Sequence, residues 1–190
     1  SVGEVARPLL IGNEEHRFLI IEQLQMVDRP SEAIILEPMG KNTAPALTLA
    51  ALWSADRDED ATLLVMPADH HIAKHKKFGK AVSEGEALAR DGLFVTFGVP
   101  PTGPEIGYGY IRVTGEKVGS SRKPSALKMA EFVEKPDMET AKGYLSTGEY
   151  VWNSGTFMMR ASVWLDQIEA HRPEIAEACR AAYASGSVDG

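Results

Sequence analysis

The sequence lacks a second cysteine, a long apolar run and an excess of positive charge, and each lack excludes a class of protein. Its single cysteine, Cys179, cannot form an internal disulfide, which favours a reducing compartment and predicts a cytoplasmic protein. No apolar run approaches the length that spans a bilayer, so we expect no membrane association. The formal net charge of −7 offers no general attraction for nucleic acid.

The dinucleotide-binding pattern G-x-G-x-x-G is also missing. The stretch "GYGY" (107–110) has two glycines without the third, and it precedes a predicted strand rather than a helix. A nicotinamide-dependent oxidoreductase is therefore disfavoured. A zinc site is disfavoured as well, because His71 and His75 stand four residues apart without the Glu of H-E-x-x-H or an evident third ligand.

Short apolar runs alternate with helical patterns in the first half of the chain. We predict strands at 8–12, 33–37, 61–67 and 92–99, and helices at 13–28, 43–56 and 74–90. Asn13 and Thr43 are the expected N-caps of the first two helices. This order predicts an α/β protein with a mostly parallel sheet flanked by helices.

The rhythm of the sequence changes in its second half. We predict strands within 100–113, 126–136 and 150–161, a short helix at 137–148, and two helices between 162 and 184 that are broken at Pro173. No internal repeat is present, and no linker marks a second domain. We therefore expect this half to extend the same sheet within one domain, 1–190.

Three polar clusters follow predicted strands, at the edge where open parallel sheets bind ligands. They are "EPMGKNTAP" after 33–37, "PADHH" after 61–66 and "EKP" after 130–133. In the first cluster, a glycine permits close backbone approach, Lys41 attracts an anion, and free amides at a helix start suit a nucleotide. An ordinary strand-to-helix loop with capping is the alternative interpretation.

Asp69 ends a buried strand, and two interpretations of it stay open. A carboxylate at that place can hold Mg²⁺, which prefers one or two protein carboxylates with waters and phosphate oxygens. Asp is also a good capping residue for the helix that follows. In the third cluster, Glu134 and Lys135 would point to opposite sides of a strand that continues through them, which argues against a mutual ion pair. Lys74, Lys76, Lys77 and Lys80 are expected to form a solvated helix face.

Five motifs together resemble the bacterial mannose-1-phosphate guanylyltransferases, in the long form often fused to a mannose-6-phosphate isomerase domain. They are, in the family's order and spacing, "EPMGKNTAPA", "LLVMPADHHI", "GPEIGYGYI", "FVEKPD" and "WNSGTFMMRASVWL". The resemblance runs from about residue 8 to about residue 180. It implies a Rossmann-like fold of the nucleotide-diphospho-sugar transferase type, in which 1–99 is the nucleotide-binding half and 100–190 the sugar-phosphate-binding half.

The resemblance implies that GTP and mannose 1-phosphate give GDP-mannose and pyrophosphate, with Mg²⁺ as cofactor. In this comparison Asp69 binds the Mg²⁺ that bridges the nucleotide phosphates, and Lys135 meets the sugar phosphate during catalysis. The implied substrate-binding residues are Glu37, Lys41, Asn42 and Thr43 on the nucleotide side, and Gly109, Glu134 and Asn153 on the sugar side.

The sequence also departs from the family. No Gly-rich phosphate loop with its first strand precedes residue 8, and no second metal-binding Asp motif precedes Gly190. Lys41 stands where Arg is common, and Ile106 where Thr is common. We therefore expect the middle of a catalytic domain, inactive alone, with an exposed sheet edge that favours a homo-oligomer. The alternatives are a related sugar-1-phosphate thymidylyl- or uridylyltransferase, and a non-catalytic regulatory subunit that binds nucleotide sugars.

Overall fold

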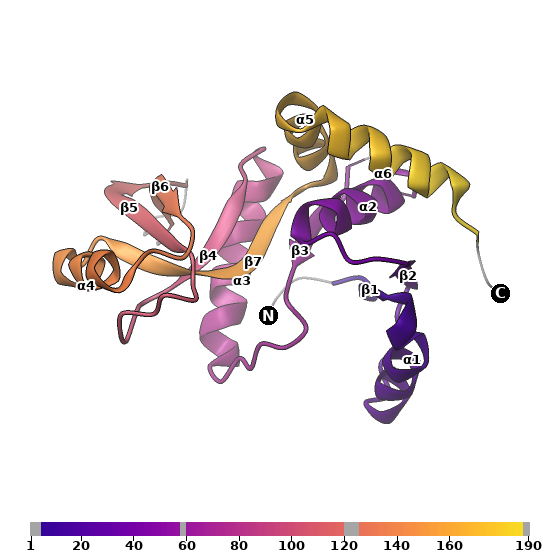
Figure 1. Ribbon diagram of the computed structural model, residues 1–190, viewed down its shortest axis with the longest axis horizontal. Helices are drawn as coiled ribbons and strands as arrows, with labels where there is room; N and C mark the ends of the chain where they lie inside the picture. Colours follow the sequence, from indigo (N-terminus) through magenta and orange to yellow (C-terminus); the bar gives the residue numbers. More distant parts are fainter. Residues whose placement is uncertain (1–4, 58–59, 120–125, 188–190) are drawn as a thin grey trace. The chain divides into compact units, whose positions relative to one another are not determined.

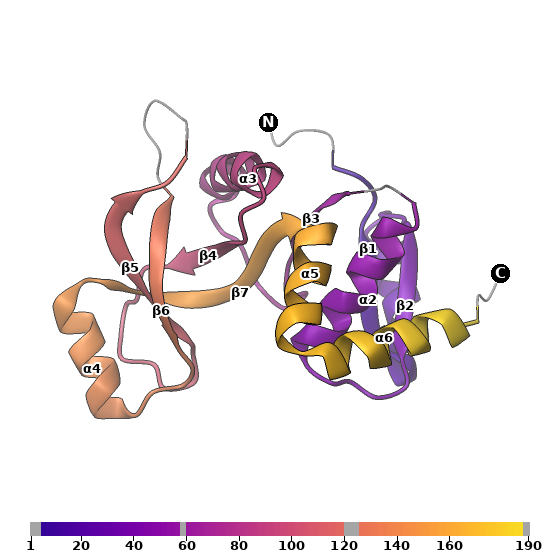
Figure 2. The same ribbon diagram turned by 90° about the horizontal axis from the view of Figure 1, so that it is seen from above.

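The computed structural model describes residues 5–57, 60–119 and 126–187, and the chain divides into two units (Figure 1, Figure 2). One unit is Thr62–Met159, and the other joins the chain up to Ala61 with the chain from Arg160 onward. The chain passes from one unit to the other at the start of one strand and inside another. The predicted division into a nucleotide-binding half, 1–99, and a sugar-phosphate-binding half, 100–190, describes where ligands bind rather than how the chain packs, and it stays a prediction.

The unit Thr62–Met159 is built on a five-stranded sheet. Its elements are β3 (Thr62–Val65), α3 (His75–Arg90), β4 (Val95–Val99), β5 (Tyr110–Lys117), β6 (Leu127–Val133), α4 (Met138–Thr147) and most of β7 (Tyr150–Arg160). The strand order is β3-β7-β5-β6, with β4 also paired to β7. Strand β7 runs antiparallel to β4 and to β5, and β5 runs antiparallel to β6.

Helix α3 covers part of this sheet with its apolar face. Val82 and Ala89 pack with Met158 of β7, and partly buried side chains of β3 and β4 join them. The apolar positions recur every three or four residues along the helix, which places them on one side. The four lysines at 74–80 are exposed, so their prediction as a solvated face is confirmed.

The other unit packs helices together beside a small parallel sheet. Its elements are β1 (Leu9–Asn13), the 3₁₀ helix η1 (Glu14–His16), α1 (Arg17–Met26), β2 (Ala33–Glu37), α2 (Thr43–Ala55), α5 (Ala161–His171) and α6 (Pro173–Ser185). Helix α2 contributes the buried Leu47, Ala51 and Leu52, and it packs against α5 and α6. The Trp164 indole N–H donates a hydrogen bond of 3.0 Å to Thr48 Oγ1, which ties α5 to α2.

The mixed α/β class is confirmed, and the pairing of strands adds a detail that the alternation of elements did not reveal. Parallel pairing joins β1 and β2, from Leu9 opposite Ala33 to Asn13 opposite Glu37. The pairs of known register in the larger sheet are antiparallel instead. Strand β7, from the second half of the chain, takes part in two of these antiparallel pairs, with β4 and with β5, and the third pair joins β5 to β6.

The two expected helix caps differ in outcome. Asn13 does cap a helix start, since its Oδ1 accepts a hydrogen bond of 2.8 Å from Glu15 N, although the first turn is 3₁₀ rather than α. Thr43 as an N-cap is wrong, because the N-cap of α2 is Asn42, with φ 67° and ψ −166° and without a side-chain capping bond. A β-branched residue such as Thr fits this conformation even less well, and Thr43 stands in the first turn of the helix instead.

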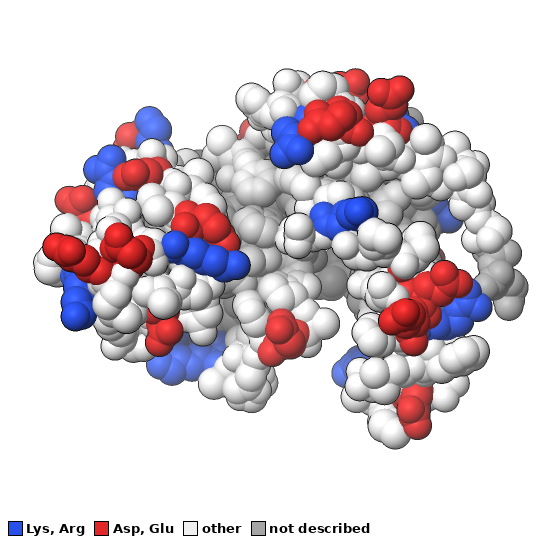
Figure 3. Space-filling view, in the orientation of Figure 1, with Lys and Arg blue, Asp and Glu red and all other residues white. Residues whose placement is uncertain are grey.

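None of the helices in the described ranges combines the length and the apolar character needed to cross a membrane. On the face shown in Figure 3, basic and acidic side chains are interspersed, and neither sign forms a continuous field.

Candidate functional site

An open pocket of ≈ 490 Å³ lies in the unit Thr62–Met159. It is lined by the loop after β3, the end of β4, the loop before β5, the residue after β6 and the first half of β7. This lining brings together three of the predicted site residues, Gly109, Glu134 and Asn153. Its volume lies within the range of small-molecule sites, and its walls mix aromatic side chains with a few polar groups.

Gly109 is hydrogen-bonded to Asn153 on the polar side of this pocket. Its carbonyl oxygen accepts a hydrogen bond of 2.8 Å from the backbone N–H of Asn153. The Asn153 side-chain oxygen accepts from Gly155 N at 3.1 Å and from Thr96 Oγ1 at 3.3 Å. Those two bonds occupy the amide oxygen, so the amide N–H groups are the part of Asn153 that can serve a ligand.

Glu134 and Lys135 are arranged differently from the prediction. Strand β6 ends at Val133, and Lys135 has φ 45°, in the left-handed region. The chain therefore turns at this point, and Lys135 Nζ lies 3.7 Å from Glu134 Oε1. The expectation that the two side chains point apart is wrong because the strand does not continue through them. Both are more than half exposed, so this ion pair is weak and a ligand can replace it.

The residues after Lys135 hold this turn in place. Pro136 is buried, and Asp137 caps helix α4 by accepting a hydrogen bond of 2.8 Å from Thr140 N. That bond lowers the pKa of the Asp137 carboxyl from its ordinary value, because it favours the charged form. The Glu-Lys pair thus stands between a strand and a capped helix, which limits its freedom to move.

Asp69 is not a helix cap. Helix α3 begins at His75 with Lys74 as its N-cap, so the capping interpretation of Asp69 is wrong. Its side chain is 89% exposed, and its oxygen Oδ1 lies 3.9 Å from His70 Nε2. The carboxylate therefore stands in solvent in the loop that follows β3, four residues after Val65, without a role in holding the helix that follows.

The exposed Asp69 carboxylate could serve as a single ligand of a divalent metal ion. Mg²⁺ takes one or two protein carboxylates and completes its shell with waters and phosphate oxygens, which an exposed carboxylate permits. In the part of the chain that the structure describes, no three or more His, Cys, Asp or Glu side chains gather closely enough to enclose a metal. Any ion held by Asp69 would therefore need oxygens from the substrate or from water.

The predicted nucleotide contacts belong to the other unit. Glu37 ends β2, Lys41 and Asn42 lie in the loop, and Thr43 begins α2, so the four are neighbours along one segment. Burial raises the pKa of the Glu37 carboxyl from its ordinary value. None of the four lines the pocket described above. They form a candidate site through sequence proximity, without the convergence seen around Glu134.

Backbone strain marks two of the predicted residues. Within the described ranges, only Asp28, Asn42 and Lys135 combine a side chain with a positive φ. Such conformations cost of order 1–3 kcal/mol and cluster at active sites and ligand clamps. Asn42 stands on the predicted nucleotide side, and Lys135 on the predicted sugar-phosphate side.

Among the lining residues that sequence reasoning missed are His70, Tyr108 and Trp152. The rings of Tyr108 and Trp152 meet edge to face, with centroids 5.2 Å apart. The Trp152 indole N–H is buried without a hydrogen-bond partner among the described residues. A signal was available, because Tyr108 and Trp152 are sequence neighbours of Gly109 and Asn153. Their convergence depends on the pairing of β5 with β7, which the sequence does not show.

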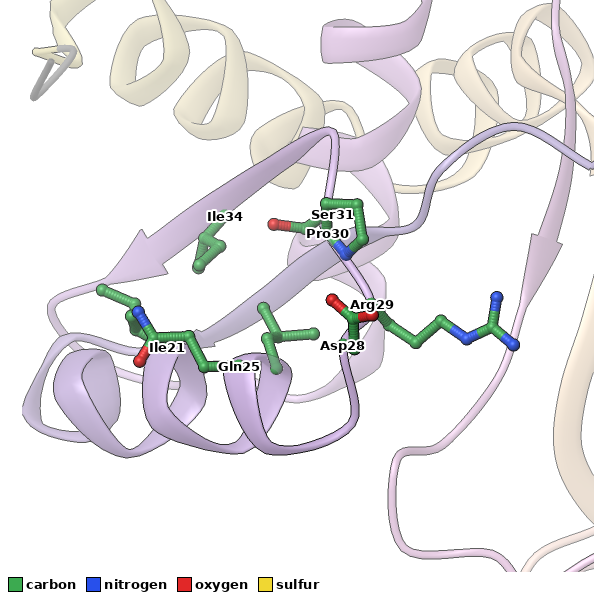
Figure 4. A pocket seen from close by; sticks show the side chains of 8 residues that line it. Ile21, Gln25, Asp28, Arg29, Pro30, Ser31 and Ile34 are labelled. Carbon is green, nitrogen blue, oxygen red and sulfur yellow. The ribbon is translucent and has the colours of Figure 1, made fainter.

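A second pocket of ≈ 450 Å³ lies between α1 and the start of β2 in the other unit (Figure 4). Ile21 and Leu24 of α1 and Ile34 of β2 form its apolar side, and Asp28 lies at its polar rim. No predicted site residue lines it. It therefore does not compete with the first pocket as the candidate site.

Comparison with known proteins points to one family. The sequence profile described as nucleotidyl transferase matches residues 2–190. Xanthan biosynthesis protein XanB of Xanthomonas campestris is 47% identical over 182 residues, which cover 96% of this chain and 38% of that protein. The mannose-1-phosphate guanylyltransferase of Klebsiella pneumoniae is 48% identical over 179 residues, covering 94% of this chain and 38% of that protein. The chain thus spans little more than a third of the length of either relative.

The chain also resembles a solved structure. The crystal structure of mannose-6-phosphate isomerase from Helicobacter pylori superimposes with a TM-score of 0.83 at 34% sequence identity. The match covers 95% of this chain and 66% of that one. The likeness therefore extends over both units of the chain.

Proposed function

This chain belongs to the nucleotidyl transferase family, and from that premise we propose that it serves the synthesis of GDP-mannose and pyrophosphate from GTP and mannose 1-phosphate. The observation that carries the proposal is the pocket of the unit Thr62–Met159, where Gly109, Glu134 and Asn153 converge. The names of the relatives support the choice of sugar and nucleotide. The xanthan relative's name supports use of the product in polysaccharide synthesis.

The pocket offers complementary groups for a sugar phosphate. The Glu134 carboxylate accepts hydrogen bonds from sugar hydroxyls, and the Asn153 amide N–H groups donate to the same ring. Lys135, next to Glu134, supplies a positive charge for the phosphate once its contact with Glu134 is exchanged for the ligand. The edge-to-face pair of Tyr108 and Trp152 forms an apolar wall beside these polar groups.

The reaction needs positioning and charge neutralisation rather than a protein nucleophile. A phosphate oxygen of mannose 1-phosphate attacks the α-phosphorus of GTP in line. The new P–O bond forms as the bond from the α-phosphorus to the bridging oxygen breaks, and pyrophosphate leaves with that electron pair. Mg²⁺, held by Asp69, would neutralise charge on the nucleotide phosphates.

On the nucleotide side we propose that Glu37, Lys41, Asn42 and Thr43 contact the base and ribose of GTP. Two properties of the segment support this assignment. Asn42 carries backbone strain that its helix does not need, and Glu37 is a partly buried carboxyl at a strand end.

The direct test is product formation. The full-length protein that contains this segment is incubated with GTP, mannose 1-phosphate and MgCl₂, because the 190 residues alone are expected to be inactive. GDP-mannose is measured by ion-exchange chromatography alongside released pyrophosphate. We expect both products in equal amounts, loss of both with EDTA, and recovery on adding excess Mg²⁺. Replacing GTP by dTTP or UTP, or mannose 1-phosphate by glucose 1-phosphate, should give at least about tenfold lower turnover. Preference for dTTP or UTP would favour the thymidylyl- or uridylyltransferase alternative. Binding of GDP-mannose without turnover would favour a regulatory role.

A further inference from the structure

We infer that Gly109 is a positioning residue, whose missing side chain leaves the space that seats the Glu134 carboxylate at the pocket. The inference rests on the proposed function, since it explains how one ligand-facing group of that site is held. It assigns to Gly109 a role different from the one its motif implies, which is to let a ligand approach the backbone.

The space at Gly109 is already occupied by the protein itself. A Cβ atom at this position would lie 2.9 Å from Glu134 Oε2 and 2.9 Å from both Cε2 and Cζ of the Phe132 ring. Non-bonded carbon atoms prefer about 3.5–4.0 Å, so the Glu134 carboxylate and the Phe132 ring would both have to move. The Glu134 carboxylate is the end of a flexible, more than half exposed side chain, and therefore moves at least cost.

Backbone conformation does not explain the glycine. The described glycines with positive φ are Gly92, Gly119, Gly148 and Gly155, and Gly109 is not among them. The backbone at position 109 therefore allows a residue with a side chain without strain in φ. What opposes such a residue is that the space for its Cβ atom is already filled. Gly109 also accepts the backbone bond from Asn153, so the same residue sits between two groups that face the pocket.

The two roles of Gly109 predict different results in a double-mutant cycle. The variants are Gly109→Ala, Glu134→Ala and both together, and the measurement is the dissociation constant for mannose 1-phosphate by titration calorimetry. If Gly109 acts through Glu134, Gly109→Ala weakens binding about ten- to a hundredfold in the unaltered protein, the scale of one charge-assisted hydrogen bond. In the Glu134→Ala background it should then change binding less than about twofold.

The controls separate position from folding. Gly103→Ala makes the same substitution in the same loop, where a Cβ would meet nothing within 4 Å, and should bind mannose 1-phosphate like the unaltered protein. The Phe132 ring is a second neighbour of the added carbon, so the cycle is repeated with Phe132→Ala, where the carboxylate is the remaining close contact. GTP affinity and the thermal unfolding midpoint are recorded for every variant, and GTP affinity should stay within about twofold.

Each outcome decides between the possibilities. Equal weakening by Gly109→Ala with and without Glu134 would overturn the inference and leave the proposed function standing, because the ligand would then approach Gly109 directly. Unchanged affinity in the Gly109→Ala protein would overturn the inference as well. If the unaltered protein failed to bind mannose 1-phosphate while remaining folded, the proposed function and the inference would both fall.

Discussion

The two predicted parts of the site are prepared for a ligand in different ways. Around Glu134, residues from several strands and loops converge on one pocket and are held by contacts among themselves. Along Glu37–Thr43, the predicted residues follow one another on a single loop and helix start, and the marked feature is the strained backbone of Asn42. The first part is organised by packing across a sheet, and the second by local conformation.

The difference teaches where each part is vulnerable. A pocket built from distant segments depends on the contacts between them, so small additions such as one methyl group at Gly109 are expected to disturb it. A segment organised locally depends on the conformations its own residues accept. We therefore expect changes near Glu134 to act through neighbours, and changes near Asn42 to act through the backbone.

The largest effect is expected at Asp69, which belongs to the pocket's unit but supplies a charge rather than a contact. In the full-length protein, Asp69→Asn should lower magnesium-dependent GDP-mannose formation at least about a hundredfold, the scale of one charge-stabilising group. The fold should be retained, because the side chain is 89% exposed and caps nothing. Asp91→Asn, an exposed acid at the end of α3, is the matched control and should leave turnover intact. Near-normal turnover in Asp69→Asn would remove Asp69 from the metal site.

A second, smaller effect tests which ligand the pocket receives. In the full-length protein, Lys135→Ala should raise the Michaelis constant for mannose 1-phosphate about ten- to a hundredfold and leave that for GTP nearly unchanged, because one charged hydrogen bond to phosphate is lost. Glu134→Gln keeps the side chain's size and should impair recognition of the sugar, again sparing GTP. Steady-state kinetics with each substrate varied in turn would measure both, with Lys142→Ala on α4 as the exposed-lysine control. Weaker GTP binding with an unaffected sugar phosphate would reverse the assignment of the two parts.

Much of the fold could be predicted from the sequence, because strands and helices here follow local patterns. The apolar run before Asp69 does form β3. The pattern at 74–90 does form α3, which begins one residue later than predicted, at His75, and ends at Arg90 as predicted. Pro173 does separate two helices, α5 and α6. Periodicity and helix-breaking residues carry this information without any knowledge of long-range pairing.

The candidate site could be predicted only where it coincides with a motif. The turn at Lys135 was not predictable, because nothing in "FVEKP" tells whether the strand ends at Val133 or continues. His70 and Trp152 were missed for another reason, since their convergence follows from sheet pairing between segments about eighty residues apart. The division of the chain into two units is likewise a property of long-range contacts.

A third prediction tests the locally organised part. Asn42 has φ 67° and ψ −166°, a region that essentially only glycine enters freely. Asn42→Gly should therefore raise the free energy of unfolding by about 1 kcal/mol, after part of the relieved strain is offset by the greater freedom of glycine in the unfolded chain. GTP affinity should fall up to about tenfold, because a polar side chain facing the nucleotide is lost. Urea unfolding and GTP titration measure the two effects, and unchanged GTP affinity would make Asn42 a strained loop residue without a binding role.

The smallest effect is expected at Asp28, which has the same kind of strain outside both parts of the site. Asp28 has φ 49° and follows the end of α1, where its N–H bonds to Gln25 O at 3.1 Å and the next N–H, from Arg29, bonds to Leu24 O at 3.2 Å. This pattern closes a helix with a left-handed residue, a position that glycine occupies most readily. Asp28→Gly should therefore raise the free energy of unfolding by roughly 0.5–1 kcal/mol.

Neither GTP nor mannose 1-phosphate affinity should change in Asp28→Gly, because none of the predicted site residues lines the pocket beside it. Comparison with Asn42→Gly distinguishes two uses of a strained residue. At Asp28 the strained backbone ends a helix, whereas at Asn42 we propose that it directs a side chain toward a ligand. Equal loss of GTP affinity in the two variants would show that Asn42→Gly does not act through a lost contact between the Asn42 side chain and GTP. The distinction between a site organised by packing and one organised by local conformation would then lose its support on the nucleotide side.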